Sequence, residues 1–344
     1  FIKTERKPLM IDWNNKNVLV TGGASFIGSH LCEQLVKRGA NLRVAENFSS
    51  GERENLFHVK CEILEGDLLD PSFCDQATRG IQLVFHLAAD HGGRGYIDSH
   101  PVECSTNMIL DGQVFKYAHR NGAEKIIFAS SGCVYPTSAQ MDVSKEVFLY
   151  EDMVTPPYEA DDLYGWAKLM AELTLKSYHQ QHGIGTASCR YFTVYGPRCT
   201  ENHAVMAMIA RGYLKLDPFE VWGDGEQIRN WTYVDDIVSG TIATAEKIHD
   251  GTSINLGTME RIKVKDCADQ VIDTLNPSAT IRLLTDKPTG PLNRVASNAL
   301  AKELLDWEPT TTFAEGLQKT IQWYLESKTT EQAKSDLTKK LVGR

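Results

Sequence analysis

The sequence predicts an α/β fold in which a doubly wound parallel sheet carries a smaller C-terminal lobe. Three observations predict it. Short apolar runs alternate with helical patterns in the first half of the chain, a glycine-rich turn follows the first run, and the second half is broken by Gly and Pro. With 344 residues, of which 42% are hydrophobic, the chain is long enough to bury a substantial core.

The alternating segments follow one another in the order of βαβ units. The expected strands are 17–20, 42–45, 83–87, 125–129 and 186–192, and the expected helices are 28–38, 114–120 and 164–182. We expect the sheet domain over residues 14–195 and the smaller lobe over 196–330, with part of 230–250 packing back on the sheet domain. The polar, lysine-rich end, 327–344, is expected to be a solvated helix or a frayed tail.

Composition argues against several classes of protein. A formal net charge of -9 disfavours a nucleic-acid partner. The eight cysteines include no Cys-x-x-Cys pair, which fits reduced thiols better than disulfides or a metal site. No apolar stretch approaches the roughly 20 residues of a membrane span, and Phe1 to Trp13 lacks the apolar region of a signal peptide. We therefore expect a cytoplasmic protein with no membrane partner.

The turn between the first strand and the first helix, Thr21 to Gly28, suits a dinucleotide. Glycines stand at positions 22 and 28, and Ser25 replaces the expected middle glycine. Such a turn lets the backbone approach a pyrophosphate, whose charge the helix N-terminus meets. Glu46 ends the second strand, where a carboxylate accepts hydrogen bonds from a ribose diol and repels a 2′-phosphate. These features predict a Rossmann-like domain that prefers NAD to NADP.

Tyr164 and Lys168 are four residues apart on a predicted helix and so lie one above the other. An ammonium close to a phenol favours the phenolate, so Tyr164 could exchange protons with a substrate alcohol. Taken alone, the pair is more typical of a solvated helix face. The neighbouring dinucleotide turn gives it weight.

Several further motifs are His86-Leu87-Ala88-Ala89, Ser130 to Pro136 (SSGCVYP) and Arg190 to Pro197 (RYFTVYGP). With the turn and the Tyr164/Lys168 pair, they resemble the extended short-chain dehydrogenase/reductase family over roughly residues 15–325. The resemblance implies NAD in the Rossmann lobe and a nucleotide-diphosphate sugar in the C-terminal lobe. It also implies Tyr164 as acid/base, Lys168 as its activator and a ribose ligand, and Ser131 as the hydroxyl that orients the sugar. Without the resemblance, Ser131 would be interpreted as a turn or cap residue.

The resemblance supplies the remaining site residues. The expected cofactor contacts are Gly22, Ser25, Phe26, Ile27, Gly28, Glu46, Asn47, Asp67, Leu68, Leu87, Ala88, Ala89, Asn107, Tyr164 and Lys168. The expected substrate contacts are Gly92, Gly93, Arg94, Ser131, Cys133, Thr193, Asn202, His203, Arg229 and Arg294. Asp67 suits the adenine edge, although capping of the next helix would explain it equally well.

Within the family, Ala89 to Ile97 and Cys133 most resemble the GDP-mannose 3,5-epimerases. In that subgroup the glycine-rich loop lies against the hexose, and the cysteine works with a lysine to move protons at carbon. Here His203 stands in place of the lysine, although histidine still exchanges protons near neutral pH. Without the resemblance, Cys133 would be a small buried hydrophobe and His203 a hydrogen-bonding or surface residue.

Three further positions concern the nucleotide sugar. Thr193 stands where relatives usually carry asparagine, so the donor geometry differs there. Arg229 and Arg294 match family arginines that grip the phosphates, a task that suits the guanidinium fork. On their own, both would be interpreted as exposed charges.

The expected reaction is an epimerisation with no net redox change. Tyr164 takes the C4 hydroxyl proton while hydride passes to NAD, and the resulting ketone acidifies the C3 and C5 hydrogens. A base such as the Cys133 thiolate removes one of them, and an acid on the opposite ring face, for which His203 is the candidate, returns it before hydride goes back. The alternatives are a 4-epimerase, a net 4-dehydrogenase and a non-catalytic NAD-binding protein. A 4,6-dehydratase is disfavoured because Gly132-Cys133 replace its Asp-Glu pair. The base of the nucleotide and the identity of the sugar stay open. The predicted helices at 110–121 and 163–182 suggest a homodimer, although their apolar faces could equally cover the sheet.

Overall fold

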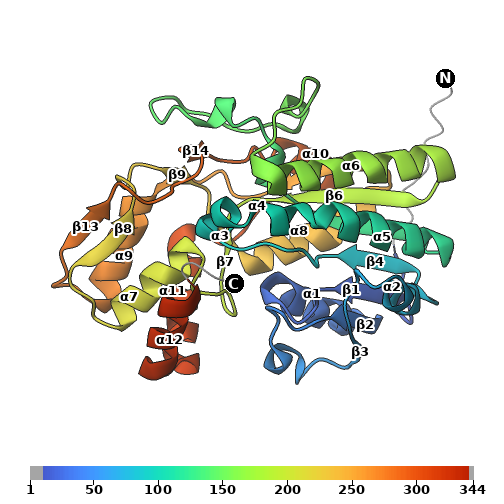
Figure 1. Ribbon diagram of the computed structural model, residues 1–344, viewed down its shortest axis with the longest axis horizontal. Coiled ribbons are helices and arrows are strands. Elements are labelled where there is room, and N and C mark those ends of the chain that lie inside the picture. The colour runs from blue at the N-terminus through green and yellow to red at the C-terminus, as the bar shows by residue number, and fades with distance from the viewer. Residues whose placement is uncertain (1–10, 341–344) are drawn as a thin grey trace.

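The computed structural model describes residues 11–340 and shows a seven-stranded parallel sheet between two layers of helices, with a smaller lobe beside it (Figure 1). The strand order is β11-β6-β5-β4-β1-β2-β3. The strands are β1 (Asn17–Thr21), β2 (Asn41–Glu46), β3 (Cys61–Glu65), β4 (Leu83–His86), β5 (Lys125–Ser131), β6 (Gly185–Tyr191) and β11 (Asp250–Leu256). The predicted doubly wound α/β class is confirmed. Two parts of the sequence-based predictions lie outside the described residues. They are residues 1–10 of the start, which is expected to lack a signal peptide, and residues 341–344 of the predicted tail.

Helices cover both faces of the sheet. Those on one face are α1 (Phe26–Lys37) and α8 (Val234–Lys247), and those on the other are α2 (Pro71–Thr78), α5 (Asn107–Arg120) and α6 (Asp162–His182). Successive side chains of a strand point to opposite faces. Val18 and Val20 accordingly join the core under α1 and α8, whereas Leu19 joins the core under α5 and α6. Residues buried on both faces explain why the strands appear as continuous apolar runs.

Residues 234–256 return to the sheet domain. Helix α8 packs on α1, and β11 pairs in parallel with β6 to form one edge of the sheet. A single division at 195/196 therefore does not describe the packing, because the return extends beyond 250. The other edge strand, β3, was absent from our sequence-based strands, since its sequence Cys-Glu-Ile-Leu-Glu leaves much of it exposed.

The smaller lobe contains most of the remaining chain. Its elements are α7 (Ala204–Tyr213), β8 (Phe219–Trp222), β9 (Ile228–Arg229), β12 (Ile262–Lys263), α9 (Val264–Leu275), β13 (Ile281–Leu284), β14 (Asn293–Arg294), α11 (Phe313–Ser327) and α12 (Thr330–Lys340). Between the lobes lie α3 (Arg94–Ser99), α4 (Pro101–Ser105), the paired strands β7 (Val194–Tyr195) and β10 (Thr232–Tyr233), and α10 (Ala299–Leu305). Short 3-10 turns occur at Arg53–Leu56, Gly132–Val134, Ser138–Gln140 and Glu151–Met153. None of the described helices is long and apolar enough to span a bilayer.

The predicted helix at the end of the chain is found as α12, with most of its described side chains exposed, but the helix is docked and not frayed. Helix α12 packs against α7, with Ala333 and Leu337 buried in the core. The lysines around these two apolar residues hid the docking face from the sequence analysis.

A buried ion pair fastens α6 to the sheet. Glu172 of α6 and Arg190 of β6 lie 2.8 Å apart, and each side chain is only 5% exposed. Ser130, Ser253 and Tyr135 complete the network through hydrogen bonds to one partner or the other. Because α6 carries Tyr164 and Lys168, this pair fixes the helix that carries the predicted acid/base residues.

Arg190→Met is expected to lower the free energy of unfolding by about 3–5 kcal/mol, because it leaves the Glu172 carboxylate buried without its counter-charge. Urea unfolding monitored by circular dichroism measures the loss. The matched control is Lys302→Met, which breaks an ion pair with Glu308 whose side chains are 62% and 52% exposed. That change should cost no more than about 1 kcal/mol. Equal losses in the two variants would contradict the assignment.

Candidate active site

Two adjoining pockets form one cleft along the carboxyl ends of the parallel strands, where open α/β sheets bind their ligands. One runs beside Glu46, Asp67 and Ala88, and the other reaches Tyr164 and Lys168. Both are lined by Ser25, Leu87 and Ala89 among others, so they meet at the glycine-rich turn. A third pocket continues from Cys133 and His203 into the smaller lobe.

The turn has the close packing that a dinucleotide needs. Gly22 adopts the left-handed conformation (φ +69°), and a Cβ added there would lie 2.9 Å from the Ala88 nitrogen. A Cβ on Gly28 would lie 2.2 Å from the Gly22 carbonyl oxygen. Ser25 donates a hydrogen bond to that carbonyl (2.6 Å) and does not cap α1. The first turn of α1 therefore faces the cleft without a side-chain cap, as pyrophosphate binding requires.

Glu46 lies at the end of β2 and lines the cleft. Its carboxylate accepts hydrogen bonds from the backbone nitrogens of Ala24 (3.1 Å), Asn47 (3.1 Å) and Phe48 (3.2 Å), and burial raises its pKa. These three donors fix the side chain at the place expected for the ribose diol. The residues present thus fit NAD.

Asp67 lines the same end of the cleft, together with Leu68. Its carboxylate accepts a hydrogen bond from the Leu69 nitrogen (2.9 Å), whereas Asp70 caps α2. The capping alternative for Asp67 was therefore wrong, and the adenine-edge interpretation stays a prediction.

Asn107 does not line the cleft. Its amide bonds to both backbone groups of Asp90 (2.7 and 2.8 Å) and to the Cys104 carbonyl (3.0 Å). It holds the loop after Ala89 in place and lies behind it. Of the predicted cofactor residues, only Gly28 and Asn107 are absent from the pocket walls, because Gly28 packs against Gly22.

Tyr164, Lys168 and Ser131 come together at the inner end of the cleft. The Lys168 nitrogen lies 5.7 Å from the centre of the Tyr164 ring and 4.5 Å from that of Phe128. Burial raises the pKa of Tyr164 despite a hydrogen bond to Ser131, and burial lowers the pKa of Lys168. The expected effect of the ammonium on the phenol is therefore outweighed by burial. Within the protein alone, the phenol is the favoured form.

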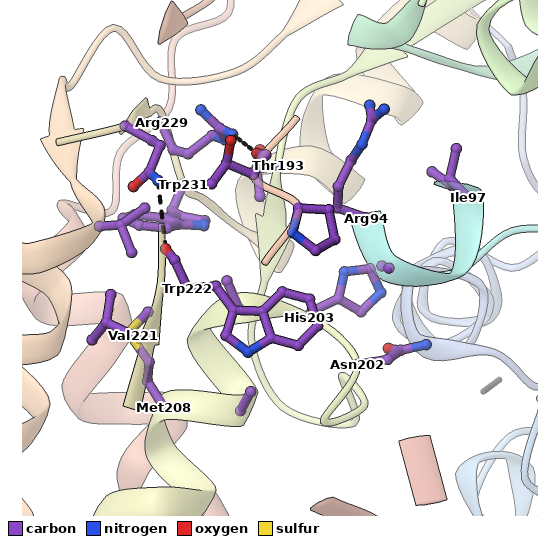
Figure 2. A pocket seen from close by; sticks show the side chains of 18 of the residues that line it. Arg94, Ile97, Thr193, Asn202, His203, Met208, Val221, Trp222, Arg229 and Trp231 are labelled. Carbon is purple, nitrogen blue, oxygen red and sulfur yellow. Dashed lines mark hydrogen bonds between the residues drawn. The ribbon is translucent and has the colours of Figure 1, made fainter. Parts of the chain in front are cut away.

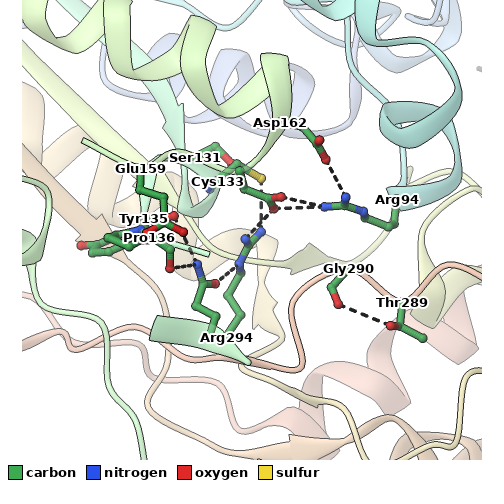
Figure 3. A network of polar contacts seen from close by, with 12 residues as sticks. Arg94, Ser131, Cys133, Tyr135, Pro136, Glu159, Asp162, Thr289, Gly290 and Arg294 are labelled. Atoms are coloured by element: carbon green, nitrogen blue, oxygen red, sulfur yellow. Dashed lines mark hydrogen bonds and ion pairs between the residues drawn. The ribbon is translucent and has the colours of Figure 1, made fainter. Parts of the chain in front are cut away.

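Cys133 lies in the turn after β5, and the guanidinium of Arg294 is directed at its sulfur (Figure 3). Arg294 donates from Nη1 to Cys133 Sγ (3.2 Å), from Nε to Gln140 (2.6 Å) and from Nη2 to Asp161 (2.8 Å). Every nitrogen of the fork is thus engaged by the protein. The structure sets its positive charge beside the sulfur. The side chain also lines the third pocket, so its expected contact with the phosphates stays a prediction.

Arg94 ties the glycine-rich loop to the start of α6. It pairs with Asp161 (3.0 Å) and Asp162 (2.6 Å), so Asp161 is shared with Arg294 (Figure 3). Burial acts to raise the pKa of Asp161, but Arg294 and Arg94 outweigh it and hold that pKa below its usual value. The shared carboxylate stays charged between the two cations.

The loop itself packs on the turn before α7. A Cβ on Gly93 would lie only 1.9 Å from the carbonyl oxygen of Asn202, so only glycine fits this contact. Gly92, Thr193 and Asn202 line the pockets on both sides of this contact.

His203 is the residue immediately before α7 and lines two of the pockets (Figure 2). Burial lowers its pKa to about 4. The positive end of the α7 dipole acts in the same direction. The imidazole is therefore neutral at physiological pH and can accept a proton, whereas the sequence analysis gave the role of base to Cys133 and that of acid to the group opposite it.

Arg229 lies deeper in the third pocket (Figure 2). It donates to the carbonyl oxygens of Ile228 and Thr289 (both 2.8 Å), and burial, aided by Arg294 and Arg94, lowers its pKa to about 9. Among the described residues no carboxylate forms an ion pair with it. A buried cation paired only with carbonyls suits a phosphate.

Arg211, Trp222 and Gln227 also line this pocket, and the sequence analysis missed all three. Arg211 is 5% exposed, and burial lowers its pKa. Gln227 is 2% exposed, and its Oε1 has no partner among the described residues. The available signal was a single arginine in the otherwise apolar helix Ala204–Tyr213.

Gly28→Ala is expected to weaken NAD binding by about 10–100-fold, about 1.4–2.8 kcal/mol, because the new methyl group would push the turn out of shape. Titration calorimetry on protein stripped of nucleotide gives the dissociation constant. Gly112→Ala serves as the control, since a Cβ there meets nothing within 4 Å. Unchanged binding in Gly28→Ala would remove the turn from the cofactor site.

His203 also predicts a pH dependence of stability. Its folded pKa, about 4, lies below the ordinary histidine value of 6.5, so its contribution to stability is present above pH 6.5 and is lost as the pH falls toward 4. The wild type should therefore lose stability relative to His203→Gln between these pH values. Urea midpoints at several pH values measure the difference, and parallel curves would contradict a buried neutral imidazole.

Comparisons with known proteins agree with this geometry. Residues 18–257 match the model of the NAD dependent epimerase/dehydratase family. The chain is 32% identical to GDP-mannose 3,5-epimerase of Arabidopsis thaliana, over 96% of this chain and 90% of that protein. It is 31% identical to UDP-glucuronic acid decarboxylase 1 of the same plant, over 93% and 72%.

A solved structure agrees with the same assignment. UDP-glucuronic acid 4-epimerase from Bacillus cereus, in complex with UDP-glucuronic acid and NAD, superposes with a TM-score of 0.80 at 28% identity, covering 90% of this chain and 99% of that one. These similarities show an NAD-dependent enzyme, and the cleft beside the glycine-rich turn is its candidate site. The chain belongs to the NAD dependent epimerase/dehydratase family.

Proposed function

We propose that the protein epimerises a nucleotide-diphosphate sugar at C3 and C5, the carbons beside a transient C4 ketone. These are the two carbons specified in the name of its relative GDP-mannose 3,5-epimerase. One observation carries the proposal: Cys133 and His203 line the same pocket as Tyr164 and Lys168. A thiol and a neutral imidazole at one substrate site form a proton donor and acceptor for carbon chemistry. A simple oxidoreductase has no need of this second pair.

The first proton transfer belongs to Tyr164. Bound NAD supplies a hydride acceptor for C4 and, while oxidised, a positive charge that favours loss of the phenolic proton. Tyr164 accepts the proton of the C4 hydroxyl, and Ser131 orients that hydroxyl. Lys168, buried against Phe128, holds its ammonium below the phenol. The same phenol returns the proton when the alcohol re-forms.

The second proton transfer belongs to His203 and Cys133. The ketone acidifies the hydrogens on C3 and C5, so a modest base can remove one of them. The neutral imidazole of His203 accepts this proton, and Cys133 delivers one from the opposite ring face. Arg294, 3.2 Å from the sulfur, stabilises the negative charge that Cys133 gains on giving up its proton.

The third pocket takes the nucleotide diphosphate. Arg229 binds a phosphate, and Arg211 and Gln227 offer the base a donor and an acceptor beside the indole of Trp222. Guanine is the first candidate because of the similarity to GDP-mannose 3,5-epimerase. Uridine diphosphate sugars, which other relatives bind, are the second.

A 4-epimerase is the rival function. His203 replaces the expected lysine and Thr193 the expected asparagine, and solved relatives include a UDP-glucuronic acid 4-epimerase. In that reaction the bound keto sugar rotates in the site before hydride returns to C4, and Cys133 takes no chemical part.

The assembly and location are also proposed. Ile109 of α5 and Met170 of α6 are 64% and 46% exposed on neighbouring helices, which supports a homodimer across this face. All eight cysteines are free thiols, in keeping with a cytoplasmic enzyme.

Incubation of the wild type with GDP-mannose in heavy water should place deuterium on C3 or C5, read by NMR, because the ketone makes these hydrogens exchangeable. His203→Gln should reduce this exchange by about 10²–10⁴-fold, and Cys133→Ala should abolish inversion at the exchanged carbon, while both spare oxidation at C4. Tyr164→Phe should bind NAD and sugar yet abolish both steps. Inversion at C4 without carbon-bound deuterium, with GDP-mannose or UDP-glucuronic acid, would select the 4-epimerase.

A further inference from the structure

The C-terminal helices reach a buried carboxylate two residues before His203. Glu201 is 0% exposed, and its Oε1 accepts a hydrogen bond from the Tyr324 hydroxyl of α11 (3.0 Å). Lys328, which follows α11, places its ammonium 3.3 Å from the same oxygen. Among the described residues, no group bonds to Oε2 of Glu201. The charge of Lys328 is therefore the main compensation for a buried carboxylate.

Lys328 is itself held by two contacts. Asp336 of α12 pairs with its ammonium at 2.6 Å, and the Tyr213 hydroxyl at the end of α7 donates to its carbonyl oxygen at 3.1 Å. One residue thus connects the turn before α7, the end of α7 and α12, which lie together in Figure 1. Burial acts to lower the pKa of Lys328, but Asp336 and Glu201 outweigh it and raise that pKa.

The turn that Glu201 anchors carries functional groups on its other side. The backbone nitrogen of His203 donates a hydrogen bond to the Thr200 carbonyl oxygen (3.1 Å). The Thr200 hydroxyl donates to the side-chain oxygen of Asn202 (2.6 Å). The Asn202 carbonyl is the surface on which Gly93 packs. A shift of Glu201 would therefore move His203 and the glycine-rich loop together.

We propose that Lys328 is a positioning residue, which fixes the place of His203 in the cleft by pinning Glu201 under the turn. This inference rests on the proposed function in one respect, the role of His203 as the base at carbon. Removal of the ammonium leaves Glu201 buried without a counter-charge, so the carboxylate is drawn toward water and takes the turn with it. Oxidation at C4, which depends on Tyr164 and Lys168 on another helix, is spared.

The experiment compares four full-length variants loaded with NAD: Lys328→Met, Lys328→Arg, the double variant Glu201→Gln/Lys328→Met, and Lys302→Met as an exposed lysine from another ion pair. Three quantities are measured for each. Deuterium entry from heavy water into GDP-mannose reports the carbon step, alongside transient NADH absorbance for the C4 step. Backbone hydrogen exchange by mass spectrometry reports the protection of the peptide over 199–204.

Lys328→Met should slow deuterium entry by about tenfold or more, because small misplacement of a reacting group is costly, while NADH formation changes little. The peptide over 199–204 should exchange faster. Lys328→Arg should behave like the wild type, and the double variant should recover both signals, since a neutral Gln needs no counter-charge. Lys302→Met should match the wild type.

Wild-type exchange of that peptide in Lys328→Met would overturn the proposal, as would failure of Glu201→Gln to rescue it. A general loss of structure would instead lower NADH formation and deuterium entry together, and this result also counts against a positioning role. If the wild type labels no carbon of any sugar, the proposed function fails. The exchange of the 199–204 peptide then still decides whether Lys328 fixes the turn.

Discussion

The carboxylate of Asp161, shared by Arg94 and Arg294, is the interaction on which the arrangement of the cleft depends. It lies directly before α6, and its two partners come from the glycine-rich loop and from β14 of the smaller lobe. Through Arg294 it also orients the cation beside Cys133. One buried negative charge therefore sets the relative positions of the glycine-rich loop, α6 and the Cys133 thiol.

Burial governs the chemistry of the groups around this carboxylate. It raises the pKa of Tyr164 and lowers those of Lys168 and His203, so each is biased toward its neutral form. The neutral forms of these proton-transfer groups avoid the cost of burying a charge. The charges that the protein itself keeps in the cleft are compensated by partners, as in the contacts of Asp161 with Arg94 and Arg294.

The sequence was sufficient to predict the fold, the cofactor NAD and the meeting of Tyr164 and Lys168 beside the cleft. These features depend on local patterns: apolar runs, a turn between strand and helix, and a four-residue spacing. It was insufficient where distant segments meet. Arg294 and Cys133 are 161 residues apart, and no local pattern predicts that the guanidinium points at the sulfur. Arg211 and the docked α12 were missed for the same reason, because their significance depends on what tertiary packing places beside them.

The return of residues 234–256 to the sheet has a mechanical consequence. The chain leaves the sheet domain after β6, comes back for α8 and β11, departs for α9 and returns again with α10 against α8. Because several covalent crossings join the lobes, any movement of one lobe relative to the other must bend all of these segments together. A single backbone cut in any one crossing would leave both halves attached.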